Sequence, residues 1–334
     1  MTDSRINHGL TLEFENRGKI YRPNVLEGVQ WETEISGSPG KLTCEIMTDH
    51  VIDPGNVIRL YDGLSDYFYG YVFTTEHDSN PNKVKITAYD QIRYLKNQDT
   101  YVFPDATLSA IISNITSDYG IKEGTMANPS YKVKAHVAEN KSLLDIIDDA
   151  IDEVMMYTGE LYILFDYYGY LTLVNSTSSL FDTGMLIDVK SLQDYDIQST
   201  IDDDDVYNRV RLVYKDSDAG TLRVFESPKD GKPNTQQEQW GLLQHYESLD
   251  DVTNAQKKAD LLLSTHNHIK RIIQLKDVPG DAKTVVRAGS RIYVKMNLGD
   301  VQQDGMLIVN RCVHKWDNCV HLMDLDMEGG VFDA

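Results

Sequence analysis

Apolar side chains recur at every second position over much of residues 10–98, and turn-forming residues interrupt them at short intervals. The alternating segments include LTLEFEN, KLTCEIMTD and KVKITAYD, and turn signals stand at Gly37-Ser-Pro-Gly40, Asp53-Pro-Gly55 and Ser79-Asn-Pro-Asn82. This pattern is typical of half-buried antiparallel strands. Short strands at such spacing favour a closed or nearly closed barrel, because closure removes exposed strand edges.

The period then changes to that of amphipathic helices. In PDATLSAIISNITSDYGI, apolar residues recur at helical spacing, and Gly120 stands where a left-handed C-terminal residue belongs. In NKSLLDIIDDAIDEVMMYTGE, an apolar stripe follows Ser142, which opens a capping box. A hairpin, ELYILFDYYGYLTLVN, comes next, with Tyr168 and Gly169 near its turn. These elements predict a small α+β domain.

The strand pattern returns from about residue 186, in segments such as NRVRLVYK, SRIYVKMN and VHLMDLDM, with one helix near 253–268. We therefore predict a mainly β protein with an α+β insert, in which two antiparallel β-barrel domains flank a small α+β domain. The predicted boundaries are 1–100, 101–185 and 186–334.

The charge of the chain is strongly acidic, with 52 Asp and Glu against 32 Lys and Arg and a formal net charge of −20. Such a surface repels nucleic acid and anionic membranes, so we expect no specific nucleic-acid binding and no membrane insertion. Simple solubility is the alternative reason for the charge. Three cysteines in 334 residues argue against a disulfide framework, and the N-terminus lacks the apolar segment of a signal peptide.

Several polar clusters have a structural as well as a chemical interpretation. The tetrad Asp202-Asp203-Asp204-Asp205 could attract Ca²⁺, but it lacks the alternating ligands and the glycine of a calcium loop. His266-Asn267-His268 has the letters of a nuclease motif, yet it falls at the end of a helix, where histidine is favoured by the helix dipole. One further set lies opposite the apolar stripe of a helix and is expected to be a solvated face: Asp145, Asp148, Asp149, Asp152 and Glu153.

The C-terminal segment RCVHKWDNCVHLMDL repeats Cys-x-His twice. If Asp317 and Asn318 form a two-residue turn, side-chain alternation places both thiols and both imidazoles on one face of a hairpin. Two thiolates and two imidazoles can bind zinc, although the usual Cys-x2-Cys geometry is missing. The alternative is a packed cross-strand histidine pair with two buried thiols. The zinc candidates are Cys312, His314, Cys319 and His321.

The sequence contains no nucleophile elbow, phosphate-binding loop, dinucleotide fingerprint or HExxH motif. We therefore predict no catalytic residues, no cofactor and no enzymatic activity.

Several segments resemble the XkdQ-type phage tail proteins, which are relatives of late control protein D and of the contractile-tail baseplate hub. The resemblance begins with GNVIRLYDG, YFYGYV and VKITAYDQIRYLKNQDTYVF, and continues through TLSAIISNITSDYGI and SLLDIIDDAIDEVMMYTGELYILFD. It extends to DVYNRVRLVY, QEQWGLLQHYE, VRAGSRIYVKM and VHKWDNCVHLMDLDM, and so covers nearly the whole chain.

The resemblance implies a structural protein with two barrels of the tail-tube type. Three copies would form a pseudo-six-fold ring that connects a six-fold tail tube to a three-fold central spike or needle. The implied partners are further copies of the chain, the tail tube protein, the tape-measure protein and the surrounding baseplate proteins, with DNA passing through the lumen. The implied location is the baseplate of a virion or tail-like particle, assembled in the bacterial host cytoplasm. Two alternatives are a tail-associated peptidoglycan hydrolase and a receptor- or glycan-binding tail-tip module.

Overall fold

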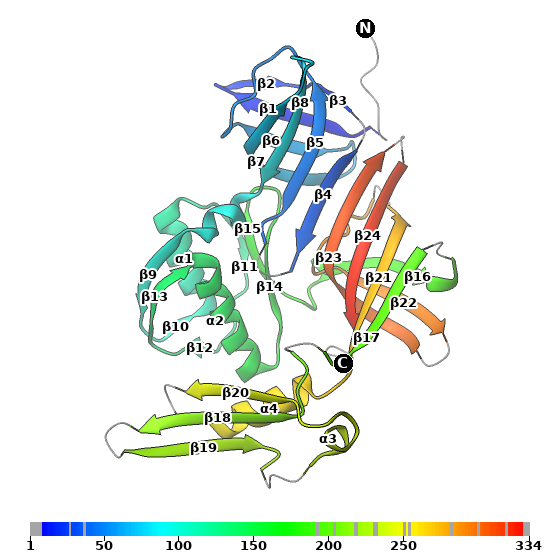
Figure 1. Ribbon diagram of the computed structural model, residues 1–334. Coiled ribbons are helices and arrows are strands. Elements are labelled where there is room, and N and C mark those ends of the chain that lie inside the picture. Colours follow the sequence, from blue (N-terminus) through cyan, green and yellow to red (C-terminus); the bar gives the residue numbers. More distant parts are fainter. Residues whose placement is uncertain are drawn as a thin grey trace. The chain divides into compact units, whose positions relative to one another are not determined.

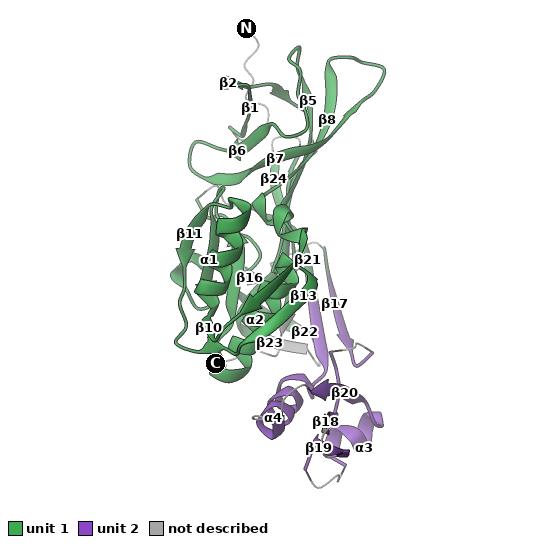
Figure 2. Ribbon diagram, turned by 90° about the vertical axis from the view of Figure 1, so that its left-hand side faces the viewer, with its two compact units in different colours: residues 1–195, 274–327 green, residues 196–273, 328–334 purple. Residues whose placement is uncertain are grey.

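The computed structural model of the chain describes residues 9–26, 28–35, 38–191, 194–202, 205–216, 220–229, 233–249, 252, 255–280, 283–298, 301–317 and 320–329. The chain folds into two compact units (Figure 2). Unit 1 comprises residues 1–195 and 274–327, and unit 2 comprises residues 196–273 and 328–334.

The first β region of unit 1 is built from strands whose buried side chains alternate with half-buried or exposed ones. These strands follow the order β4-β5-β8-β7-β6-β1-β2 with antiparallel pairing, and β3 pairs with β5. Their inward side chains, among them Leu42, Ile46 and Ile58, form one apolar core. The strands are β1 (Thr11–Asn16), β2 (Lys19–Tyr21), β3 (Asn24–Val25), β4 (Val29–Glu34), β5 (Lys41–Met47), β6 (Val57–Tyr61), β7 (Asp66–His77) and β8 (Lys83–Tyr89).

The second β region joins the first in one continuous sheet (Figure 1). β4 pairs with β23 in antiparallel register, from Val29 opposite Trp316 to Glu34 opposite Arg311. β22 pairs with β23 antiparallel and with β16 parallel. β17 (Asp194–Thr200) and β21 (Lys270–Pro279) carry the chain from unit 1 to unit 2 and back. The remaining strands are β16 (Asp182–Asp188), β22 (Arg291–Leu298), β23 (Val301–Asp317) and β24 (Val320–Gly329).

The α+β segment contains the two helices that the sequence predicts. α1 (Leu108–Tyr119) ends at Gly120, which has a left-handed φ of 64°. α2 (Leu143–Thr158) begins after Ser142, whose side chain accepts a hydrogen bond from the Asp145 amide. The helices pack in a single apolar core with the strands of the segment. The other elements are η1 (Gln91–Lys96), β9 (Gln98–Phe103), β10 (Ala106–Thr107), β11 (Glu123–Met126), β12 (Lys132–Val133), β13 (His136–Ser142), β14 (Tyr162–Asp166), β15 (Leu171–Asn175), η2 (Ser179–Phe181) and η3 (Val189–Ser191).

Unit 2 has a small sheet of its own. β18 (Arg209–Asp216) lies between β19 (Thr221–Ser227), which is antiparallel to it, and β20 (Gln244–Leu249), which is parallel. A short helix, α3 (Thr235–Trp240), precedes β20, and α4 (Ala255–His266) packs on the sheet through the buried side chain of Ala259. α4 lies within the segment 253–268 where the sequence predicts a helix, and the predicted cap Thr253 lies outside the described residues.

The prediction of a mainly β protein with antiparallel sheets is confirmed. The two closed barrels and the boundaries at residues 100 and 185 stay predictions. In the described part of the chain, no helix has both the length and the apolarity required to cross a membrane.

Candidate functional site

The aromatic residues of β7 lie where the first β region meets the α+β segment. Tyr69, Tyr71 and Phe73 alternate along the strand and therefore share one face. The ring centroid of Tyr69 is 5.8 Å from that of Tyr168, and Tyr71 is 5.6 Å from Tyr94. Phe73 is 6.0 Å from the same Tyr94. The aromatic face of β7 thus packs against η1 and the β14–β15 turn of the same chain.

The β14–β15 turn is shaped by two residues with left-handed backbone. Tyr168 has φ of 50° and Gly169 has φ of 89°, as a two-residue turn that follows strand twist requires. The flanking residues close it, since the Tyr167 amide donates to the Tyr170 carbonyl at 2.8 Å. A Cβ at Gly169 would lie only 2.6 Å from Tyr69 Cδ1, so both the backbone and the space require glycine here.

Asp90 fixes the end of the first β region. Its Oδ1 accepts from the Ile92 amide at 3.0 Å and so caps η1, while its Oδ2 accepts from the Gly40 amide at 2.8 Å. The Asp90 amide in turn donates to the Gly40 carbonyl at 3.0 Å. A Cβ at Gly40 would lie 2.5 Å from Oδ2, so this close approach requires glycine.

Asp166 and Arg287 connect the α+β segment to the second β region. Asp166, the last residue of β14, accepts from the Gly169 amide through Oδ1 at 2.7 Å. Its main-chain carbonyl accepts from Arg287 Nη2 at 2.8 Å. The Arg287 guanidinium also lies 4.3 Å from the ring centroid of Phe165 and 5.9 Å from that of Trp31. Arg287 therefore contacts residues of the first β region and of the α+β segment together.

Burial has the largest effect on the pKa values of three neighbouring residues, Asp90, Asp166 and Arg287, which we call the charge cluster. It raises the pKa of Asp90 well above its usual range, and the nearby Asp166 carboxylate raises it further. It also raises the pKa of Asp166, against the opposing effects of the Gly169 hydrogen bond and Arg287. Burial lowers the pKa of Arg287, while the two carboxylates raise it. Two buried carboxylates against one guanidinium favour the retention of a proton by the carboxylates.

Two stacked histidines lie in the core between β4, β23 and β24. His314 Nδ1 is 2.7 Å from His321 Nε2, and His314 Nε2 is 2.6 Å from the Val286 carbonyl. Because a carbonyl only accepts, Nε2 of His314 carries the hydrogen, and Nδ1 accepts from His321. Trp31 stacks on His314 at 4.8 Å and Trp316 on His321 at 4.6 Å. Burial, followed by the neighbouring His321, lowers the pKa of His314 to about 3.

The zinc candidates are brought together only in part. His314 and His321 are in contact, but both ring nitrogens of His314 are used in hydrogen bonds. Cys312 is buried, with Sγ 3.7 Å from the Val286 carbonyl, and Cys319 lies outside the described residues. Among the residues that the structure describes, no group of three or more His, Cys, Asp and Glu could hold a metal ion. The zinc site stays a prediction that metal analysis of the purified protein would test.

The acidic face of α2 is partly withdrawn from solvent. Asp145, Asp149 and Asp152 are exposed, whereas Asp148 is half-buried, as is Glu153. Burial, together with the neighbouring carboxylates, raises the pKa of Asp148 to about 7. The carboxyl group of Asp148 is therefore only partly ionised near neutral pH.

The remaining sequence candidates have structural partners. His266 donates through Nδ1 to the Asp205 carbonyl at 2.8 Å and stacks on Tyr207 at 4.7 Å. Asn267 Nδ2 lies 3.4 Å from Gln236 Oε1. Asp203 and Asp204 of the acidic tetrad lie outside the described residues.

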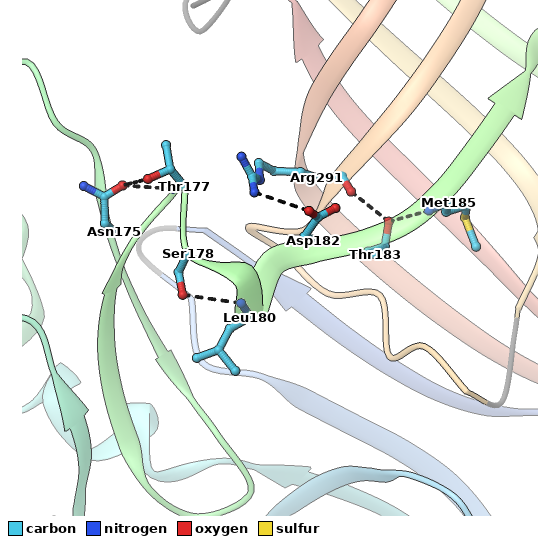
Figure 3. A network of polar contacts seen from close by, with 8 residues as sticks. All are labelled: Asn175, Thr177, Ser178, Leu180, Asp182, Thr183, Met185 and Arg291. Atoms are coloured by element: carbon cyan, nitrogen blue, oxygen red, sulfur yellow. Dashed lines mark hydrogen bonds and ion pairs between the residues drawn. The ribbon is translucent and has the colours of Figure 1, made fainter.

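A polar network holds the segment that leads from β15 to β16 (Figure 3). Asp182 lies 3.8 Å from the Arg291 guanidinium, and Thr183 Oγ1 donates to the Arg291 carbonyl at 2.7 Å. Ser178 caps η2 by accepting from the Leu180 amide at 3.3 Å. The network anchors the α+β segment to the start of β22, in addition to the contact of Arg287 with Asp166.

The sequence interpretation did not identify Asp90, Asp166 or Arg287. Asp90 follows a strand and precedes a helical turn, which is the ordinary position of a capping residue. Asp166 precedes the Tyr168-Gly169 turn and could have been recognised as a turn residue. Arg287 has no local pattern that marks it, because its partners come from distant segments.

Comparison with known proteins gives matches over nearly the whole chain. A model of a family described as YQBQ-like matches residues 29–328. The phage-like element PBSX protein XkdQ of Bacillus subtilis (strain 168) is 26% identical over 318 residues, which cover 91% of this chain and 92% of that protein.

Solved structures of tail proteins share the fold at low sequence identity. The 43 kDa tail protein of prophage MuSo2 from Shewanella oneidensis superimposes with a TM-score of 0.66 at 12% identity, covering 95% of this chain and 98% of that one. The tail protein from Neisseria meningitidis MC58 gives a TM-score of 0.68 at 11% identity, covering 97% and 98%.

Proposed function

The chain belongs to the YQBQ-like family, and we propose that it is a structural protein of a phage tail or of a phage-derived tail-like particle. The observation that carries this proposal is the extent of the similarity. It spans 91% of this chain for a protein of a phage-like element and 95% or more for two tail proteins, rather than one shared domain.

More specifically, the protein would be the hub of the baseplate. Three copies, each contributing two β regions, would form a pseudo-six-fold ring. Such a ring could contact a six-fold tail tube on one side and a three-fold spike or needle on the other, because heterologous contacts that return on themselves close a ring. The continuous sheet through β4 and β23 supports this proposal, since it fixes the two β regions of one copy to each other.

The proposed partners are further copies of this chain, the tail tube protein, the central spike or needle protein, the tape-measure protein and the surrounding baseplate proteins. The proposed location is the baseplate of the particle, after assembly in the bacterial cytoplasm.

The acidic charge would serve the passage of DNA. Each copy carries a formal charge of −20, and carboxylates that line a lumen would repel the DNA backbone and keep it from binding in transit. Neutralising lumen-facing Asp and Glu should then slow DNA delivery. Unchanged delivery kinetics would contradict this part of the proposal.

We assign no catalytic role to the chain. Carboxylates with raised pKa often mark active sites, but Asp90 and Asp166 are each only 5% exposed and are tied to main-chain amides. A glycoside hydrolase needs two carboxylates that flank a bound sugar. The cluster lies instead inside the protein, where it holds segments together.

Deletion of the gene from a lysogen or producer strain tests the proposal. We expect no complete tails after induction, and recovery of tails when the wild-type gene is supplied from a plasmid. Complete tails of normal length in the deletion strain would contradict a structural role. Complete tails that fail only on intact cell walls would favour the hydrolase alternative, which a zymogram of the purified protein would then detect.

A further inference from the structure

A small, partly open cavity lies where the three segments of unit 1 meet. It has a volume of about 10 Å³, and its lining includes Thr33, Gly40, Phe165, Asp166 and Arg287. The walls come from the first β region, from β14 and from the loop before β22, so the cavity is part of the junction described above.

Two polar atoms of the lining residues have no hydrogen-bond partner of normal geometry within the described protein, although Gln91 lies near enough to Asp166 to lower its pKa. They are Asp166 Oδ2 and Arg287 Nε, and both are buried. Asp166 uses its other oxygen for the Gly169 amide, and Arg287 uses Nη2 for the Asp166 carbonyl. Buried polar atoms in folded proteins nearly always have a partner, either in the protein or in an ordered water.

The two atoms differ in character when Asp166 is ionised, because Oδ2 then only accepts, whereas Nε–H only donates. A cation would be attracted by the carboxylate but repelled by the guanidinium. An anion would be attracted by the guanidinium but repelled by the carboxylate. A water molecule satisfies both atoms, since it can accept one hydrogen bond and donate another. The cavity volume is close to the minimum that one water needs.

Two hydrogen bonds of the lining residues hold the walls of the cavity in place. Thr33 Oγ1 accepts from the Ala288 amide at 2.9 Å, next to Arg287 in sequence. Asp90 Oδ2 accepts from the Gly40 amide at 2.8 Å.

We propose that this cavity binds one ordered water molecule, which accepts a hydrogen bond from Arg287 Nε and donates one to Asp166 Oδ2. The water would link β14 of the α+β segment to the second β region. This proposal gives the junction a bound ligand, and it does not depend on the proposed role of the protein in a tail.

A crystal structure of the full chain, at a resolution that shows ordered waters, tests the proposal directly. We expect one water within about 3.2 Å of both Asp166 Oδ2 and Arg287 Nε. If the two side chains keep these positions and no density lies between them, or if they bond to each other instead, the proposal is wrong.

A solution experiment distinguishes water from a bound cation. The unfolding midpoint of the wild-type protein should be equal in sodium chloride, potassium chloride and choline chloride at the same ionic strength. A midpoint that rises only with one alkali cation would show that a cation occupies the site, and would overturn the proposal.

Variants at residue 166 supply a second structural readout. Asp166→Asn keeps the shape and an amide that can bond to water, so we expect it to keep the water. Asp166→Leu removes both bonding atoms, so we expect it to lose the water and to exchange the amides of Tyr167 and Tyr170 faster. Equal occupancy of the water and equal exchange in the two variants would contradict the proposed contact.

Discussion

Arg287 donates through Nη2 to the main-chain carbonyl of Asp166, which lies 121 residues earlier in the sequence and 2.8 Å away. Arg287 is half-buried, and its guanidinium lies 4.3 Å from the ring centroid of Phe165 and near the buried carboxylates of Asp90 and Asp166. The Arg287 side chain, which comes from the loop before β22, thus contacts both the first β region and the α+β segment. Buried charge clusters often indicate an active site. In a protein that we propose to be structural, we interpret this cluster as a contact that holds segments together.

Replacement of Arg287 by Met should destabilise the protein by roughly 1–3 kcal/mol, because it removes the hydrogen bond from Nη2 to the Asp166 carbonyl and the cation beside two buried carboxyl groups. Denaturant unfolding of the purified variant measures this loss. Arg223→Met is the control, since Arg223 is exposed and packs over Phe225, so it should cost less than about 1 kcal/mol. Equal losses for the two variants would contradict the account of the cluster.

His314 should make the protein sensitive to acid. Its pKa is lowered from 6.5 to about 3 in the folded state, so its contribution to stability is complete above pH 6.5 and is lost as the pH falls from there toward 3. We expect the difference in unfolding free energy between pH 7.5 and pH 4.5 to be roughly 1–3 kcal/mol smaller in His314→Gln than in the wild type. The exposed His50 provides a control variant, His50→Gln, which should keep the wild-type difference. If both variants keep it, the buried histidine is not the cause.

Asp148 should have the opposite dependence on pH. Its folded-state pKa of about 7 lies above the usual 3.8, so the stability linked to its protonation is complete below pH 4 and is lost as the pH rises through 7. Asp148→Asn should therefore raise the melting temperature at pH 8 by a few degrees and raise it by less at pH 5. Asp149→Asn should show no such gain, because it removes an ion pair in which Lys141 Nζ lies 2.5 Å from Asp149 Oδ2. The account fails if both variants gain equally at pH 8.

Gly169→Ala tests the turn that packs against β7. The substitution places a Cβ at φ of 89° and within 2.6 Å of Tyr69, so we expect a loss of about 1–3 kcal/mol in unfolding free energy. Gly63→Ala is a matched control, because the space around Gly63 is open and its φ is not left-handed. A turn that tolerates alanine at residue 169 as well as at residue 63 would mean that Tyr69 does not hold it in place.

Much of the local structure could be predicted from the sequence. The limits of α1 and α2 follow from apolar spacing and from the capping positions Gly120 and Ser142. The Tyr168-Gly169 turn follows from its residue types. The predicted contact of His314 with His321 is present, but β23 extends through Asp317, which was predicted to be a turn residue, and Asn318 lies outside the described residues. These features depend on neighbours in the sequence, so their signals are local.

The pairing of β4 with β23 could not be predicted in this way. This pairing brings Arg311 Nε within 2.6 Å of Glu32 Oε1, which is 279 residues away in the sequence. The sequence of one strand does not show which distant strand it pairs with. For the same reason Arg287 was missed. The same holds for Tyr69 and Tyr71, whose aromatic partners Tyr168 and Tyr94 come from later segments of the chain.

The most direct test of the central proposal is the copy number of this chain in tails purified from an induced lysate. Quantitative mass spectrometry against the tail tube protein, with labelling to locate the chain, gives this number. We predict about three copies per tail, all at the baseplate, as a single trimeric ring requires. Absence from purified tails, or dozens of copies along the tube, would contradict the hub role.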